Sequence, residues 1–174
     1  MIFVWLVVIV LAVFADQLTK YLAILFLEPV GSVPLWQDVL HLTYVENTGA
    51  AFGMLKDQRW VFLTISTVAI VAILVYMIWK KPKDNLLCLS LSFVVGGGIG
   101  NMIDRVLLAY VVDFIDFCLI DFAVFNVADC FVTIGAGLMM LWAILGLVKE
   151  SKQQKAAVAA DGEDEIEDAS HESL

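Results

Sequence analysis

The sequence has 174 residues, of which 61% are hydrophobic and 17% are charged, and its mean hydropathy is +0.91. Soluble domains are about 45–50% apolar and about 25% charged, so this composition excludes an ordinary soluble protein and predicts an integral membrane protein. The net charge of −9 is concentrated in residues 161–174, which hold seven acids, and no basic patch indicates binding to nucleic acid.

Four apolar segments predict four transmembrane helices. The first runs over residues 2–15 and continues to residue 27 beyond the sequence DQLTK; the others span residues 60–79, 86–108 and 128–148. About 20 residues of helix cross a hydrocarbon core of about 30 Å. The first segment has no basic n-region and no small cleavage-site residues, so we interpret it as a retained helix and not as a signal peptide.

Two lysine clusters predict the orientation, because positively charged loops usually lie on the cytoplasmic side. The clusters follow the second and fourth segments and comprise Lys80, Lys81 and Lys83, and Lys149, Lys152 and Lys155. Both termini are therefore expected to be cytoplasmic, with residues 28–59 and 109–127 outside. We expect a membrane domain over residues 1–150 and an acidic, disordered tail over residues 151–174.

The first outer segment is too long for a plain loop and has some strand character. HLTYVEN at 41–47 is rich in β-branched and aromatic residues, and NTGAAFG at 47–53 predicts a turn. Asn47 could bind a peptide carbonyl or a phosphate there, or it could only stabilise the turn.

One aspartate lies in the second outer segment and another lies just after it. Asp113 follows the third predicted helix and Asp129 opens the fourth, so opposite helix directions bring both to one membrane face. Two close carboxylates share a proton: the charged one activates water while the protonated one stabilises a carbonyl oxygen. Asn126 or Asp129 could instead cap the fourth helix, and the sequence leaves both interpretations open.

The third helix contains GNMIDR, in which Asn101, Asp104 and Arg105 share one side. They could contact substrate, or they could form a polar network that locks helices together; Arg105 could hold a backbone carbonyl or a lipid phosphate. The depth of Asp104 favours an ion pair with Arg105 over catalysis. Four glycines in residues 96–100 allow another backbone to approach closely.

Asp16 and Lys20 lie four residues apart in the first helix, which favours a local ion pair or an interface anchor over a catalytic device. The sequence disfavours a zinc site and a nucleophilic catalyst, because it has two histidines, no HExxH pattern and no evident base for Cys130.

Two functions of other classes compete with a peptidase. A proton- or ion-conducting subunit would need acids throughout the membrane depth, but the cytoplasmic halves of the first, second and fourth helices hold none. An assembly factor would use the glycine-rich helix for packing and would not need the outer acids. GIGN at 98–101 has Asn where the GxGD proteases need Asp.

Five motifs occur in the order and spacing of the bacterial lipoprotein signal peptidases, or signal peptidase II. They are DQLTK at 16–20, NTGAAFG at 47–53, GGGIGNMIDR at 96–105, VVDF at 111–114 and FNVAD at 125–129. The sequence resembles this family from residue 1 to about residue 149. It departs at Cys130, where the family usually has serine.

The resemblance implies a membrane all-α fold of four transmembrane helices with a small extracytoplasmic β-cradle and a short interfacial helix. It implies an endopeptidase that removes signal peptides from diacylglyceryl-modified prolipoproteins before the lipidated cysteine, without metal or other cofactor. The catalytic pair would be Asp113 and Asp129. Supporting or substrate-binding positions would be Asp16, Lys20, Asn47, Gly49, Asn101, Asp104, Arg105, Asn126 and Ala128.

The same resemblance implies prolipoproteins and membrane lipids as partners. It also implies a location in the bacterial plasma membrane, with the active site near the extracytoplasmic face.

Overall fold

The computed structural model describes residues 2–49 and 58–172, and this part of the chain contains four long helices and a three-stranded sheet. The helices are α1 (Ile2–Phe26), α2 (Arg59–Lys80), α3 (Asn85–Leu107) and α4 (Val127–Glu172). The strands are β1 (Ser32–Trp36), β2 (Leu40–Asn47) and β3 (Val111–Asp116), and a 3-10 turn, η2, spans Cys118–Ile120. All four helices are long and apolar enough to cross a membrane, so the predicted fold class is confirmed.

The chain divides into two compact units, Met1–Leu138 and Met139–Leu174. The first holds α1, α2, α3, the sheet and the start of α4, and the second holds the rest of α4. The backbone continues as helix from residue 151 to Glu172, where a disordered tail was expected, and residues 173–174 lie outside the described residues. The division into a membrane domain and an acidic tail therefore stays a prediction.

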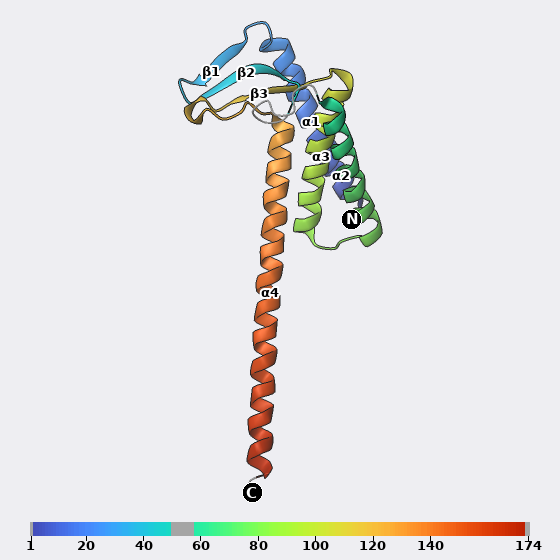
Figure 1. Ribbon diagram of the computed structural model, residues 1–174, viewed down its shortest axis with the longest axis vertical. Helices are drawn as coiled ribbons and strands as arrows, with labels where there is room; N and C mark the ends of the chain where they lie inside the picture. Colours follow the sequence, from blue (N-terminus) through green and yellow to red (C-terminus); the bar gives the residue numbers. More distant parts are fainter. Residues whose placement is uncertain (1, 50–57, 173–174) are drawn as a thin grey trace. The chain divides into compact units, whose positions relative to one another are not determined.

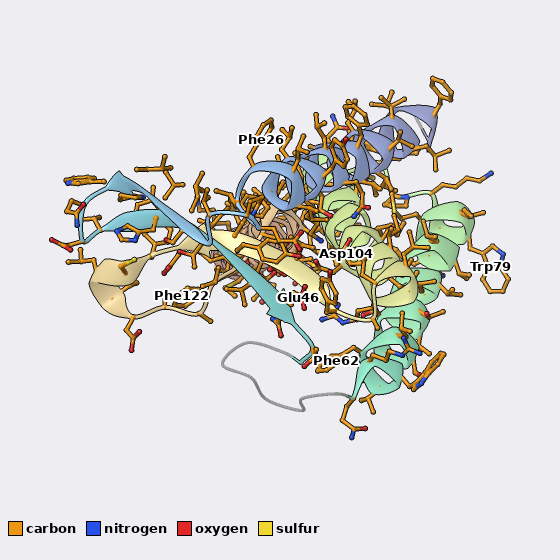
Figure 2. The ribbon with its side chains drawn as sticks, turned by 90° about the horizontal axis from the view of Figure 1, so that it is seen from above. Phe26, Glu46, Phe62, Trp79, Asp104 and Phe122 are labelled. Atoms are coloured by element: carbon orange, nitrogen blue, oxygen red, sulfur yellow. The ribbon has the colours of Figure 1, made fainter. Side chains whose placement is uncertain are left out.

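Helices α1, α2 and α3 run together as one bundle below the sheet (Figure 1). Each contributes one residue to a buried apolar cluster of Ile9, Ile70 and Val95. The outward faces are apolar and exposed, and Trp79 at the end of α2 points away from the bundle (Figure 2). Lipid tails are as apolar as these side chains, so helix contacts depend on close packing and on interhelical polar bonds.

The sheet is antiparallel with the strand order β1-β2-β3. Strand β2 confirms the prediction for residues 41–47. Strands β1 and β3 were not predicted: Pro34 interrupts the pattern of β1, and a proline is tolerated there because β1 is an edge strand.

Strand β3 positions Asp113. Its neighbours Val112 and Phe114 pack against Ala23 and Leu27 at the end of α1. Because side chains alternate along a strand, burial of these two on one face turns Asp113 to the other face of the sheet, and its cross-strand neighbour is Val45 of β2.

Two glycines of α3 let neighbouring elements approach closely. A Cβ atom on Gly97 would collide with the carbonyl oxygen of Ala128 in α4, and one on Gly100 would collide with the carboxylate of Asp16 in α1. The glycine-rich run therefore permits the close backbone approach that the sequence predicted.

We predict that Gly97→Ala destabilises the protein by about 1–3 kcal/mol, because α4 must move to admit the methyl group. The matched control is Gly137→Ala, since a Cβ there meets nothing within 4 Å. Thermal unfolding in detergent should show a lower Tm for Gly97→Ala alone. Equal Tm values for both variants would contradict this packing.

Candidate active site

A buried ion cluster joins α1 to α3. Lys20 Nζ lies 3.0 Å from Asp16 Oδ2 and 2.8 Å from Asp104 Oδ2, and all three side chains are almost inaccessible. Figure 2 shows Asp104 in the interior of the bundle. The predicted Asp16–Lys20 ion pair is confirmed, and Asp104 extends it to a second helix.

The predicted ion pair between Asp104 and Arg105 is wrong. Consecutive helical residues project about 100° apart, so Asp104 turns to α1 while Arg105 does not. Asp104 also accepts hydrogen bonds from Gln17 Nε2 (2.9 Å) and from the backbone N–H of Val112 (3.2 Å).

Arg105 holds backbone carbonyls, as the sequence suggested. It donates to the carbonyl oxygens of Asn101 and Gly49, each at 3.3 Å. Its guanidinium carbon lies 5.0 Å from the ring centre of Phe62 on α2. Arg105 thus connects α3 with α2 and with the segment after β2.

Two asparagine amides hold the carboxylate of Asp113. Asn126 Nδ2 donates to Oδ1 at 2.6 Å, and Asn47 Nδ2 donates to Oδ2 at 2.9 Å. Asn47 Oδ1 accepts the backbone N–H of Gly49 at 2.9 Å, which orients the Asn47 amide group. The other residues of the NTGAAFG motif, 50–53, lie outside the described residues.

Asp129 sits in a reciprocal cap at the start of α4. Its backbone N–H donates to Asn126 Oδ1 (3.0 Å), and its Oδ2 accepts the backbone N–H of Asn126 (3.2 Å). This is a capping box. Asp129 Oδ1 accepts from Asn101 Nδ2 at 2.7 Å, and Asp16 Oδ1 accepts the backbone N–H of Ala128 at 2.8 Å. The capping interpretation is therefore correct.

The same geometry brings the two aspartates together. Asn126 bonds to Asp113 through its side chain and to Asp129 through its backbone. Both aspartates line one cavity of about 680 Å³ with Asn47, Asn101 and Arg105. Its wall also contains apolar groups of Phe62, Val132 and Ile134. The cavity thus places two carboxylates beside amide donors, a guanidinium and apolar surface.

Burial raises the pKa of Asp113 from its ordinary 3.8 to about 6, and the nearby charge of Asp129 acts in the same direction. The hydrogen bonds from Asn47 and Asn126 oppose this rise. Asp113 therefore retains a proton to a higher pH than an exposed aspartate does.

The sequence prediction missed two supporting residues. Gln17 Nε2 donates to Asp16 Oδ2 (3.2 Å), to Asp104 Oδ1 and to the carbonyl oxygen of Gly100 (3.2 Å). The ring of Phe62 stacks against the Arg105 guanidinium. The position of Gln17 between Asp16 and Lys20 was a usable signal, because a carboxamide donates to acids on a facing helix.

A family model described as signal peptidase (SPase) II matches residues 8–145. The chain belongs to the signal peptidase II family. The protein is thus an aspartic peptidase that crosses the membrane several times, as predicted.

Relatives cover most of the chain. The lipoprotein signal peptidase of Caldanaerobacter subterraneus subsp. tengcongensis is 52% identical over 130 residues, covering 75% of this chain and 88% of that protein. The lipoprotein signal peptidase of Brevibacillus brevis is 48% identical over 126 residues, covering 72% of this chain and 85% of that protein. A bacterial membrane enzyme structure solved by the in meso method at 2.3 Å superposes with a TM-score of 0.75 at 33% identity, covering 87% of this chain and 91% of that chain.

We predict a pH-dependent stability difference between Asp113→Asn and the wild type. A carboxyl whose pKa is raised on folding stabilises the folded state at low pH, and this contribution is lost as the pH rises through about 6. Relative to the wild type, the variant should therefore gain about 1–2 kcal/mol between about pH 5 and about pH 7.5. Thermal unfolding in detergent at both pH values measures the difference, and a constant difference would contradict the raised pKa.

Proposed function

We propose that this signal peptidase II removes signal peptides from diacylglyceryl-modified prolipoproteins, with Asp113 and Asp129 as its catalytic pair. The bond cut would be the amide just before the lipidated cysteine. The observation that carries the proposal is the Asn126 bridge, which fixes both carboxyl groups beside one cavity.

The reaction follows from two carboxyl groups that share one proton. The ionised aspartate takes a proton from water as the water oxygen bonds to the scissile carbonyl carbon. The protonated aspartate donates a hydrogen bond to the carbonyl oxygen and stabilises the tetrahedral intermediate. When the C–N bond breaks, the leaving nitrogen receives a proton from the pair, which returns to its singly protonated state.

The cavity suits a substrate that is part peptide and part lipid. Asn47, Asn101 and Arg105 offer donors for peptide carbonyl groups, while Phe62, Val132 and Ile134 offer apolar contact. Asp113 lies on β3, shortly after the end of α3, and Asp129 lies in the first turn of α4, whereas the lysine clusters precede α3 and lie in the later part of α4. With the lysines in the cytoplasm, the site lies near the extracytoplasmic face and both termini are cytoplasmic.

Cleavage of a diacylglyceryl-modified prolipoprotein by the purified protein tests this function. Asp113→Asn and Asp129→Asn should each lower kcat by at least about 10³-fold, because neither remaining group can complete the proton transfers.

Asp116→Asn is the matched control, since Asp116 lies on the same strand but its side chain accepts from Thr43 Oγ1 on β2. This variant should cleave at nearly the wild-type rate. Normal cleavage by either Asp113→Asn or Asp129→Asn would disprove the assignment of the pair.

A further inference from the structure

We infer that Lys20 is a positioning residue for catalysis: through Asn101 it keeps Asp129 as the charged member of the pair and leaves the shared proton on Asp113. This inference rests on the proposed function and deepens it. Lys20 does not line the cavity. Its charge lowers the pKa of Asp113, but this effect is smaller than the rise that burial causes. Its action on Asp129 passes through Asn101, which it contacts.

Lys20 fixes the orientation of the Asn101 amide. Lys20 Nζ donates to Asn101 Oδ1 at 2.8 Å, and Asn126 Nδ2 donates to the same oxygen at 3.0 Å. An ammonium group has only donors, so turning the amide over would place N–H groups against N–H groups. Asn101 Nδ2 must therefore face Asp129 Oδ1, to which it donates at 2.7 Å.

The bonds that reach Asp129 favour its charged form. Each of its two oxygens accepts one N–H group, from Asn101 and from the Asn126 backbone. The carboxylate also lies in the first turn of α4, where the helix dipole stabilises negative charge. Without Lys20, the Asn101 oxygen keeps only the donor from Asn126, so the orientation that presents Nδ2 to Asp129 is held less firmly.

Asp113 differs from Asp129 in its surroundings. Its two oxygens also accept N–H groups, from Asn47 and Asn126, but it is 2% exposed and lies on a strand, not in the first turn of a helix. Burial favours the neutral form of a carboxyl group. The shared proton therefore belongs on Asp113, and Asp129 is the base that activates water.

Among the described residues, the other charged groups near the pair come from α1 and α3, and Cys130 of α4 supplies a thiol. Asp16 and Asp104 both pair with Lys20, and the charge of Arg105 interacts with both Asp129 and Asp113. The residues of β2 and α2 that line the cavity, Asn47, Phe62 and Ser66, carry no charge. Among the charged groups of the described residues, Lys20 alone donates to the side-chain Oδ1 of Asn101.

The test is the pH dependence of kcat for Lys20→Met, measured on a diacylglyceryl-modified prolipoprotein from about pH 4.5 to about pH 8.5. A less firmly held donor to the charged base should move the acidic limb of the pH–rate profile, where the base takes up a proton, up by about one pH unit. Rates per folded molecule should then be about tenfold below wild type at low pH and approach it at high pH. Lys20→Arg, which keeps charge and donors, should restore the limb.

Asp104→Asn is the matched control, because it removes one ion-pair partner of Lys20 and leaves the bond to Asn101 in place. Its Tm should fall while the acidic limb stays at the wild-type pH. If Lys20→Met does not fold, Lys20→Met/Asp104→Asn removes one charge of each sign and carries the same test.

An acidic limb at the wild-type pH in the Lys20→Met enzyme, whatever its Tm, would overturn the inference. A different result would refute the proposed function, namely cleavage by Asp113→Asn or Asp129→Asn. Inactive aspartate variants together with an unmoved limb would refute only the role of Lys20.

Discussion

The burial of Lys20 between two carboxylates is the constraint on which the rest of the structure depends. Removing one member of a buried ion pair costs about 3–5 kcal/mol, because the other charge is left without a partner. Asp16 and Asp104 therefore tie α1 to α3 at one register. Asp16 also accepts the backbone N–H of Ala128, so the same cluster fixes the start of α4.

Three asparagines convert this framework into a catalytic geometry. Each presents its amide nitrogen to a carboxylate, and each has its amide oxygen occupied by a donor: Lys20 for Asn101, the Asp129 backbone for Asn126 and the Gly49 backbone for Asn47. Asp129 can therefore cap α4 and act in catalysis at the same time. The capping box that starts α4 also holds the carboxylate beside the cavity.

Local sequence patterns predicted the four helices, strand β2, the Asp16–Lys20 pair and the two outer aspartates. They did not predict β3, because this six-residue strand forms by pairing with β2 and by packing on α1, and a local pattern shows neither contact. They also misassigned the partner of Asp104. That partner depends on how α1 and α3 face each other, which Gly96 and Gly100 set through contacts between distant segments. Gln17 was missed for the same reason.

The central claim is that Asn126 joins the two aspartates into one catalytic unit, and the single-turnover cleavage rate of Asn126→Ala tests it most directly. Loss of the cap should cost only about 0.5–2 kcal/mol of stability, so a folded enzyme remains for measurement. The account predicts a rate lower by about 10²-fold or more, because misplaced catalytic groups lose their alignment with the substrate. A rate within a few-fold of wild type would contradict it.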